Sequence, residues 1–537
     1  MTGGTAYRGT IPRLLAAAAE RDGDGVWLRS EAGSLTFGGT VAATGRTAEA
    51  LRSAGVRRGD LVMVTARNTP PYLICWLALA ALGAVTVAVN PRSSAAELAG
   101  LARQTAPRAL ITDAGLATLV AEAVGSGGAA TGPAVLDVAD LVPAEWADRT
   151  AMAGAARLAR LPGEAVSPDD PAVLIPTSGT TGRSKLVIQT HRAYAMAGEG
   201  FPFWMELTAA DRLMTSLPLF HVNAPAYSVM GSLACGAGLV LLDRFSASGF
   251  LDSARRHGAT EFNAIGAMLE ILMRQPERPD DCETPLRLCY TGPAPERERQ
   301  LEMERRLGLR IVVGYAMSES PYGLIWARGT RPFGTLGSVR QHPVLGTVNE
   351  ARVVSQAGAD LGPGESGELL LRNPLVTPGY FGMPQETAQV MTGGWLRTGD
   401  LVTVGGDGTY TFVSRLKEVI RRRGENLSPL EVEDVLTEHP AVLECAVVGV
   451  PSDLTEEEVK AFIVSVAGQR PDFAELRAFA GARLAAFKVP RYWQQIDALP
   501  RTPTARIAKH RLPAGHPPGE FDAEAPENES GSPEMPT

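Results

Sequence analysis

Closely spaced cysteines are lacking in this chain of 537 residues, which has only five cysteines in all. No two of them form a Cys-x-x-Cys pair, so the sequence indicates neither a disulfide framework nor a zinc site. Reduced thiols in the cytosol fit this spacing best, and we expect a cytoplasmic protein. The cysteines are Cys75, Cys235, Cys282, Cys289 and Cys445.

An excess of positive charge is lacking as well. The formal net charge is −8 at pH 7, which argues against general binding to nucleic acid. We expect no signal peptide, because the apolar run at residues 14–19 is short and Glu20 follows it. We also expect no membrane span. Residues 73–89 are nearly all apolar, but Gly83 and Thr86 favour a buried helix that passes into a buried strand.

The length exceeds that of one ordinary hydrophobic core, so several domains or subdomains are expected. Up to about residue 410, helix-like stretches alternate with short apolar strands, which predicts a layered α/β fold with largely parallel sheets. The clearest strands are predicted at residues 60–66, 109–112, 238–242 and 310–314. Residues 123–156, rich in Gly, Ala and Pro, are predicted to form a loop.

A second unit is predicted from about residue 415. Ser428 is the expected N-cap of a helix, with Pro429 at its first position and Glu431 completing a capping box. Further strands and a helix are predicted at residues 443–450, 461–467 and 473–484, which together give a small α+β lid. The predicted organisation is a body of residues 1–415, a lid of residues 416–515 and a disordered tail of residues 516–537.

The most informative segment follows an apolar stretch that ends at Ile175. It consists of Thr177, Ser178, Gly179, Thr180, Thr181 and Gly182, with Lys185 three residues later. Glycines let the backbone approach a ligand, hydroxyls and N–H groups donate to phosphate oxygens, and a lysine adds charge. The spacing is not that of a Walker A loop, and a Gly/Ser/Thr loop alone is also typical of a surface turn. The order T-S-G-T-T-G-x-x-K, however, resembles the phosphate-binding loop of the adenylate-forming superfamily.

That superfamily includes acyl- and aryl-CoA synthetases, nonribosomal-peptide adenylation domains and luciferases. The resemblance covers nearly the whole chain and implies a large α/β domain with a mobile α+β lid. It also implies that an oxyanion, usually a carboxylate, attacks the α-phosphorus of ATP and releases pyrophosphate. ATP, Mg²⁺ and a small acid would bind where the two domains meet, and CoA would accept the acyl group. The sequence does not define the acid or an oligomeric state.

Two segments resemble the family's adenine and phosphate motifs. Gly292, Pro293 and Ala294 match the loop beside adenine, where small residues let the base lie against backbone. Residues 314–320 match the pattern Y-G-M-T-E, with Ala316 in place of Gly and Ser318 in place of Thr. The resemblance implies that Tyr315 stacks near adenine, with Ala316 and Met317 beside it. It also implies that Ser318 bonds a phosphate and that Glu319 holds Mg²⁺.

A third motif, W-x-x-T-G-D, ends at Asp400, which the resemblance assigns to the ribose hydroxyls. Arg415 matches the family arginine that also reaches the ribose, and Lys417 falls at the family's hinge. Gly424 lies in an R-x-G-E-N loop that, in CoA ligases, swings toward the pantetheine tunnel. The preceding arginines at residues 421–423 have two interpretations: a solvated turn, or a group that attracts the CoA phosphates.

The acyl pocket is expected around His221, Val222 and Asn223, which follow a P-x-F-H pattern that borders the acid and the thiol path in the family. Ala264 and Gly266, within residues 262–268, are expected to line the same pocket. A single histidine is more often a core residue, so His221 depends on the motif. These segments favour ligases for short or polar acids, such as the crotonobetaine and carnitine type.

The chain departs from the family near its carboxyl end. The family segment P-x-T-x-x-G-K carries a lysine that bridges the attacking carboxylate and the α-phosphate, and here that position is Arg506. Lys509 stands three residues later. Arginine keeps the charge, but its planar fork is larger and directed differently. Either Arg506 does the lysine's work, or Lys509 replaces it, or the oxyanion is not an ordinary carboxylate.

The last possibility keeps other functions open. Some enzymes that resemble this family activate nitrite and pass it to an aryl amine to form a diazo group. They need the same ATP site without a CoA tunnel. A weakly catalytic or non-catalytic nucleotide-binding homologue is a third class. The main prediction is adenylation of a small carboxylic acid, followed by transfer to the CoA thiol.

Overall fold

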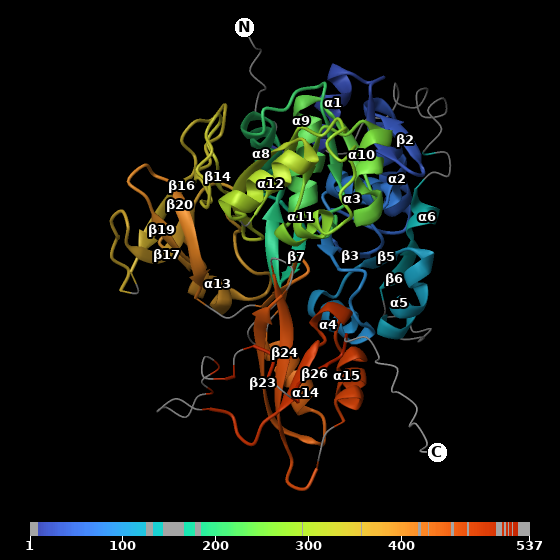
Figure 1. Ribbon diagram of the computed structural model, residues 1–537. Helices are drawn as coiled ribbons and strands as arrows, with labels where there is room; N and C mark the ends of the chain where they lie inside the picture. The colour runs from blue at the N-terminus through green and yellow to red at the C-terminus, as the bar shows by residue number, and fades with distance from the viewer. Residues whose placement is uncertain are drawn as a thin grey trace, which may run out of the picture. The chain divides into compact units, whose positions relative to one another are not determined.

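A computed structural model describes most of the chain (Figure 1). The described residues are 9–124, 133–142, 146, 166–177, 184–292, 294–355, 357–416, 420–427, 429–452, 456–469, 472–500, 507, 509, 512–513, 515–517 and 519–524. They fall into two compact units, one with residues up to 416 and the other with residues from 420 onward.

The first unit contains a nine-stranded sheet in the order β15-β14-β13-β12-β11-β9-β10-β1-β2. The strands from β13 through β12, β11, β9 and β10 to β1 are parallel, as the alternation of helices and strands predicts. The bounds are β1 (Val26–Ser30), β2 (Gly33–Thr36), β9 (Arg212–Thr215), β10 (Gly238–Leu241), β11 (Glu261–Asn263), β12 (Leu288–Thr291), β13 (Arg310–Met317), β14 (Ser320–Ile325) and β15 (Ser338–Val339).

A second, six-stranded sheet has the order β6-β5-β3-β4-β7-β8 and is parallel except for β8. Its strands are β3 (Leu61–Thr65), β4 (Val85–Ala88), β5 (Ala109–Thr112), β6 (Ala134–Asp137), β7 (Pro171–Thr177) and β8 (Lys185–Thr190). Strand β6 and the short helix α6 (Val138–Leu141) interrupt the stretch that we predicted as a loop, because β6 pairs with β5 along its whole length. That part of the loop prediction was wrong.

The helices of the first unit pack on these sheets and complete the layers. They are α1 (Ile11–Arg21), α2 (Phe37–Ser53), α3 (Pro70–Leu82), α4 (Ala95–Thr105), α5 (Ala117–Val124), α8 (His191–Trp204), α9 (Met230–Cys235), α10 (Phe250–His257), α11 (Gly266–Met273) and α12 (Arg297–Leu307). The apolar run at residues 73–89 forms buried α3 and then buried β4. Within the described ranges, no helix is long and apolar enough to cross a membrane.

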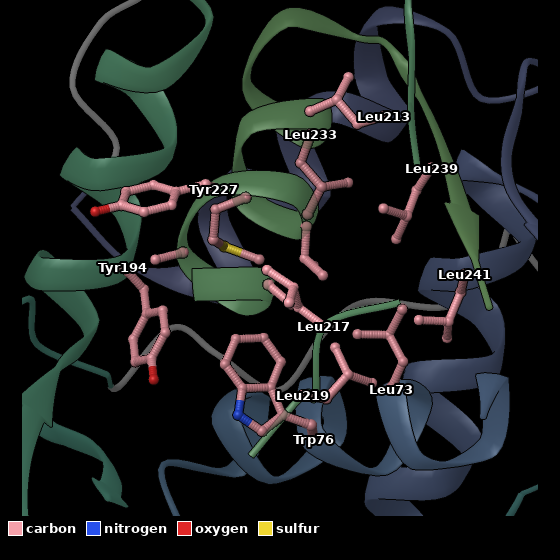
Figure 2. Close-up of a cluster of buried hydrophobic side chains, with 14 of the residues drawn as sticks. Leu73, Trp76, Tyr194, Leu213, Leu217, Leu219, Tyr227, Leu233, Leu239 and Leu241 are labelled. Carbon is pink, nitrogen blue, oxygen red and sulfur yellow. The ribbon is translucent and has the colours of Figure 1, made fainter. Parts of the chain in front are cut away.

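The centre of this unit is a dense hydrophobic cluster (Figure 2). Trp76 of α3 meets Tyr194 of α8 edge to face, with ring centroids 5.4 Å apart. Leucines of β9 and β10 in the nine-stranded sheet pack around them, and Val64 of β3 and Ile175 of β7 in the six-stranded sheet belong to the same cluster, so both sheets contribute to one core. This core fixes the strands whose ends carry the predicted site residues.

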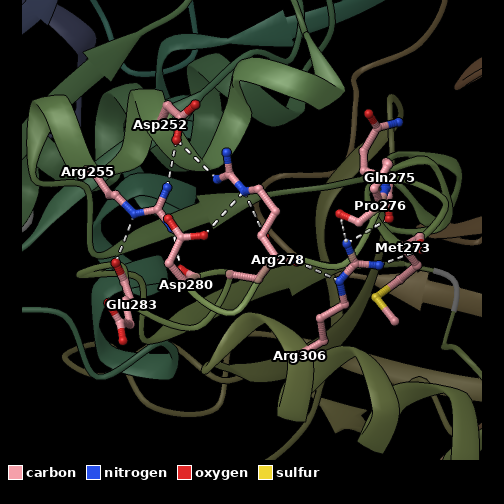
Figure 3. Close-up of polar contacts among 10 residues, drawn as sticks. Asp252, Arg255, Met273, Gln275, Pro276, Arg278, Asp280, Glu283 and Arg306 are labelled. Carbon is pink, nitrogen blue, oxygen red and sulfur yellow. Dashed lines mark hydrogen bonds and ion pairs between the residues drawn. The ribbon is translucent and has the colours of Figure 1, made fainter.

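A polar network fastens the chain between α11 and α12 (Figure 3). The buried guanidinium of Arg306 donates to the main-chain oxygens of Met273 and Gln275 at 2.6 and 2.8 Å, and to Asp281 Oδ2 at 2.9 Å. A guanidinium with this many acceptors is held in one position. Helix α11 follows β11 and α12 follows β12, so the network holds the segment that leads from α11 into the start of β12.

A third sheet of the first unit is antiparallel, with β16-β17-β19-β18 in order and β20 paired to β19. Its elements are β16 (Glu350–Val354), β17 (Ser366–Arg372), α13 (Pro384–Val390), β18 (Met391–Thr392), β19 (Trp395–Val404) and β20 (Tyr410–Arg415). All of its pairings are antiparallel, so the parallel arrangement does not extend through this part of the body.

The second unit has a four-stranded sheet, β23-β24-β25-β26, and the hairpin β21–β22. Its elements are β21 (Ile420–Arg422), β22 (Glu425–Leu427), α14 (Pro429–Thr437), β23 (Val442–Pro451), β24 (Glu457–Ser465), α15 (Phe473–Gly481), β25 (Tyr492–Gln495) and β26 (Phe521–Asp522). Strand β26 lies within the tail that we predicted to be disordered. That prediction is wrong for residues 519–524, because β26 pairs with β25 and Arg491 binds Asp522 in a bidentate ion pair.

Candidate active site

The predicted nucleotide site lies at the carboxyl ends of parallel strands. The registers Asn263–Tyr290 and Thr291–Val313 place the ends of β11, β12 and β13 side by side. In open α/β sheets, ligands bind at this edge. Gly292 follows β12 at a point where an added Cβ would lie 2.7 Å from the Gly314 carbonyl oxygen, so no side chain fits there. The backbone at the end of β12 therefore carries no side chain at Gly292, as a base lying flat against it would require. Ala294 adds only a methyl group to this loop.

Tyr315 and Asp400 come together from two different sheets. The Tyr315 hydroxyl donates to Asp400 Oδ2 at 2.6 Å and lies 3.9 Å from Met317 Sδ. Asp400 is only 3% exposed, and its Cα partner across β19 and β20 is Arg415. A short hydrogen bond to a buried carboxylate is strong and fixes both groups. The residues predicted for adenine and ribose are thus adjacent.

Ser318 and Glu319 form the turn between β13 and β14, and Ala316 and Met317 precede them at the end of β13. The Gln189 side chain donates to the Ser318 carbonyl oxygen, and the Thr377 N–H donates to the Glu319 carbonyl oxygen at 2.7 Å. The Tyr380 hydroxyl donates to Glu319 Oε1 at 2.9 Å. Burial, and secondly the Glu319 carboxylate, raise the pKa of Tyr380 above its usual range, so the phenol stays protonated.

Lys185 begins β8, directly opposite Thr177 at the end of β7. The Thr177 hydroxyl donates to the Lys185 carbonyl oxygen at 3.3 Å. Lys185 Nζ lies 4.8 Å from the centre of the Tyr380 ring, which is cation–π distance. The strand pair therefore brings both ends of the predicted phosphate loop together. Several predicted residues lie outside the described ranges: Ser178, Gly179, Thr180, Thr181, Gly182, Pro293, Lys417 and Arg506.

An amide pair joins the two segments predicted to line the acyl pocket. Asn263 Nδ2 at the end of β11 donates to Asn223 Oδ1 at 2.7 Å. His221 and Val222, half-buried, precede Asn223, and the His221 ring lies 4.5 Å from that of Phe220. Ala264 is held by a 2.9 Å hydrogen bond to the Tyr290 carbonyl oxygen, and Gly266 begins α11. The structure thus brings both predicted segments together.

In the second unit, Gly424 is the tip of the hairpin β21–β22. It has φ of 81°, and the preceding Arg423 has φ of 51°, which is a left-handed pair suited to a two-residue turn. The Gly424 N–H donates to Glu456 Oε2 at 2.6 Å. Arg422 binds Glu458 at 2.5 Å with a side chain only 3% exposed, so a solvated turn is the wrong interpretation for this arginine. Arg423 binds Glu524 at 2.8 Å.

Lys509, which the sequence offers as a substitute for the family lysine, forms an ion pair within the same unit. Its Nζ lies 2.7 Å from Glu433 Oε1 on α14, and both side chains are largely buried, at 18% and 12% exposed. Glu433 Oε1 also accepts the Val447 N–H at 2.6 Å. Lys509 therefore contributes to holding α14 on β23.

Tyr380 and Gln189 are site residues that our sequence analysis missed. Neither stands in a recognised motif, and each reaches the site through pairing of distant segments. Val187 of β8 pairs with Tyr380 in an isolated bridge, and Gln189 follows two residues later on the same strand. The only local signal was the Gly-Tyr-Phe-Gly sequence at residues 379–382, which is typical of a turn.

The chain has an α/β body that brings aromatic, acidic and basic side chains together, and a small α+β unit follows it. These features define an adenylate-forming enzyme. The AMP-binding enzyme family matches residues 15–381, and the AMP-binding enzyme C-terminal domain matches residues 431–506. The chain belongs to the AMP-binding enzyme family. It is an ATP-dependent, AMP-forming ligase of the acyl-CoA synthetase class.

Relatives and solved structures agree on this class. Crotonobetaine/carnitine–CoA ligase from Salmonella enteritidis PT4 is 32% identical over 479 residues, covering 87% of this chain and 90% of the relative. A variant of o-succinylbenzoate CoA synthetase from Bacillus subtilis, bound to a product analogue, has a TM-score of 0.80 at 27% identity and covers 93% of this chain and 98% of its own. The amide bond synthetase McbA from Marinactinospora thermotolerans has a TM-score of 0.79 at 25% identity, covering 94% and 99%. The predicted family, fold class and enzyme class are confirmed.

Proposed function

We propose that this ligase activates a small, polar carboxylic acid as its acyl-AMP and then transfers the acyl group to CoA. The observation that carries the proposal is the joining of Tyr315 to Asp400 and of Lys185 to Glu319 through Tyr380, all within one unit. The similarity to CoA ligases over 87% of the chain supports CoA as the acceptor. It does not favour the nitrite-activating or non-catalytic alternatives.

In the first half-reaction, a carboxylate oxygen of the acid bonds to the α-phosphorus of ATP and the bond to the β-phosphate oxygen breaks. Pyrophosphate leaves with the electron pair. Asp400 and Arg415 hold the ribose, Tyr315 lies against adenine, and Lys185 with the loop at residues 177–182 holds the phosphates. Fixed charges and donors of this kind lower the barrier because they need no reorganisation.

Mg²⁺ fits Glu319. Its carboxylate is half-buried at the strand ends and presents hard oxygen donors, one of which already accepts from Tyr380. The part of the chain that the structure describes contains no group of three metal-binding side chains, and Mg²⁺ bound to nucleotide typically takes one or two carboxylates and fills its shell with phosphates and water. When bound, the ion would neutralise phosphate charge.

We assign the lid's contribution to Arg506 in the first half-reaction. Lys509 is engaged by Glu433, whereas Arg506 stands at the family position of the bridging lysine. In the second half-reaction, rotation about Lys417 would withdraw Arg506 and bring the Gly424 turn to the acyl-AMP. The CoA sulfur then bonds to the acyl carbon, and AMP leaves. Alternating lid positions separate the two steps.

The acid is proposed to be small and polar because an amide pair, Asn223 and Asn263, joins the segments of the acyl pocket. Asn263 is 1% exposed, and the described residues provide no hydrogen-bond partner for its Oδ1, so a polar substituent of the substrate can satisfy it. The crotonobetaine and carnitine relatives agree with a polar acid. A cytoplasmic location fits the five free cysteines.

The purified enzyme, ATP, MgCl₂ and a panel of acids with and without CoA provide the test. The panel begins with crotonobetaine and carnitine and includes unsubstituted aliphatic acids of the same length. AMP and acyl-CoA formation that requires a polar acid and CoA supports the proposal. AMP release that requires nitrite and an aryl amine, or amide formation with an amine in place of CoA, would overturn the acceptor. Release of ADP would overturn the chemistry.

A further inference from the structure

We propose that Tyr380 is a positioning residue for adenylation, which sets the cation-binding carboxylate of Glu319 and the phosphate-binding ammonium of Lys185 relative to each other. This inference rests on the proposed function and adds a residue that the family motifs above do not contain. One side chain serves both groups: its hydroxyl contacts Glu319, and its ring face contacts Lys185.

The contacts of Tyr380 are those of a fixed side chain. It is 7% exposed, its hydroxyl lies 2.9 Å from Glu319 Oε1, and its ring centre lies 4.8 Å from Lys185 Nζ. The phenol can serve Glu319 only as a donor, because a carboxylate can only accept.

The backbone around Tyr380 is tied to both partners. On the lysine side, the Ile188 N–H donates to the Gly379 carbonyl oxygen at 3.1 Å, and the Phe381 N–H donates to the Leu186 carbonyl oxygen at 2.8 Å. These bonds extend the sheet beyond β8. The strand that begins with Lys185 and the segment that carries Tyr380 therefore move as one piece.

On the carboxylate side, Thr377 makes the link. Its N–H donates to the Glu319 carbonyl oxygen at 2.7 Å, and its hydroxyl donates to the Ile188 carbonyl oxygen at 2.6 Å. Thr377 is 1% exposed. The turn with Glu319, the strand with Lys185 and the segment with Tyr380 thus form one hydrogen-bonded assembly.

The physical benefit is pre-organisation. Lysine and glutamate side chains have many rotamers, and ordering them when nucleotide binds costs free energy. The hydrogen bond to Glu319 and the ring face under Lys185 order these two side chains when the protein folds. The cost of ordering them is therefore met before the nucleotide binds. Opposite charges on Glu319 and Lys185 then lie on either side of one phenol, positioned for a cation and for phosphate oxygens respectively.

Two variants separate the hydroxyl from the ring. Tyr380→Phe keeps the ring under Lys185 and removes the donor to Glu319. Tyr380→Leu removes both. Tyr322→Phe is the matched control, because that phenol also donates a buried hydrogen bond, at 3.0 Å to the Gln341 carbonyl oxygen, and touches neither Lys185 nor Glu319. Melting temperatures of all three establish that the variants are folded.

The first measurement is the affinity for ATP by titration calorimetry, once with MgCl₂ and once with EDTA instead of MgCl₂. It does not require the carboxylic acid substrate. Since a hydrogen bond to a charged group is lost, Tyr380→Phe is expected to weaken binding about tenfold or more with Mg²⁺ and much less without it. Tyr380→Leu is expected to weaken both. Loss of affinity in Tyr380→Phe that is equal with and without Mg²⁺, or no loss, would overturn the inference.

The second measurement separates the half-reactions. Tyr380→Phe is expected to slow acid-dependent pyrophosphate exchange about tenfold or more, while formation of acyl-CoA from supplied acyl-AMP stays close to wild type. Equal losses in both steps would show general damage and overturn the inference. If the wild-type enzyme supports no exchange with any acid, the proposed function fails, while the calorimetric result on Tyr380 is still decided.

Discussion

The hydroxyl of Tyr315 donates to the carboxylate of Asp400 at 2.6 Å, although 85 positions separate the two residues in the chain. Tyr315 lies two residues before the end of β13 in the nine-stranded sheet, and Asp400 lies in the antiparallel sheet. The bond therefore joins two sheets at the predicted nucleotide site. It predicts that adenine and ribose recognition depend on each other.

Replacing Asp400 tests the ribose assignment. Asp400→Ala removes two acceptors for ribose hydroxyls and the partner of Tyr315, so we expect pyrophosphate exchange to fall about a hundredfold, with most of the loss in KM for ATP. Tyr315→Phe, which keeps the ring, should lose much less. Exchange near the wild-type rate in Asp400→Ala would show that the nucleotide binds elsewhere.

The two basic candidates of the lid are predicted to differ. Arg506→Ala should abolish the first half-reaction, because it removes the charge that we propose bridges the attacking carboxylate and the α-phosphate. Lys509→Ala should leave exchange within about twofold of wild type and lower the stability of the second unit by about 1–3 kcal/mol, because the largely buried Glu433 loses this partner. Exchange assays and urea unfolding measure both. Loss of exchange in Lys509→Ala alone would reverse the assignment.

Gly424→Ala is predicted to affect only the second half-reaction. A φ of 81° is unfavourable for alanine by about 1–2 kcal/mol, and the added methyl group would stand at the tip that we propose approaches the acyl-AMP. We expect slower acyl-CoA formation and unchanged pyrophosphate exchange. Gly468→Ala is the control, since Gly468 has φ of 80° in the same unit and no atom of the described residues lies within 4 Å of an added Cβ. Equal effects of both variants would mean that backbone strain alone is responsible.

Glu261 predicts a pH dependence of stability. It is fully buried, and within the part of the chain that the structure describes neither carboxyl oxygen has a hydrogen-bond partner. Burial, and then the charge of Asp211, raise its pKa well above the usual range. The folded protein therefore holds this proton more tightly than the unfolded chain, so stability is lost as the pH rises from the unfolded pKa toward the folded one.

Glu261→Gln should not lose folding stability in this way as the pH rises, because glutamine does not ionise. We expect the variant to be more stable than wild type by about 1–3 kcal/mol near pH 8, and by less near pH 5, in urea unfolding. Glu298→Gln, on the exposed side of α12, should show no such dependence. A stability difference that shrinks as the pH rises would contradict this account.

Glu520 is predicted to stabilise the second unit. It lies 3.3 Å from Lys460 Nζ, and that lysine is fully buried. Glu520→Ala would leave an uncompensated charge inside, which costs about 3–5 kcal/mol. Hydrogen exchange should rise in β24 and β25 but not in the first unit. Glu475→Ala, at a side chain 67% exposed, should change little.

Local patterns predicted many of the elements closely. The strand predicted at residues 109–112 is β5, and the apolar run at 73–89 became α3 and β4, because continuous apolar residues with a glycine break are typical of buried elements. Strand β6 and strand β26 were missed. Both segments are short and lack a clear alternation of apolar and polar residues. They form strands only because β6 pairs with β5 and β26 pairs with β25.

The order of glycine, hydroxyl, acidic and basic motifs along the sequence determined the family, since each motif depends on neighbouring residues and is read locally. The roles assigned to those residues stay predictions. Tertiary structure alone decided that Tyr380 lies between Lys185 and Glu319, that Asn223 meets Asn263, and that Lys509 is engaged by Glu433. Such contacts depend on which distant strands pair, and the free energy of that pairing comes from burial across the whole core, which no short segment specifies.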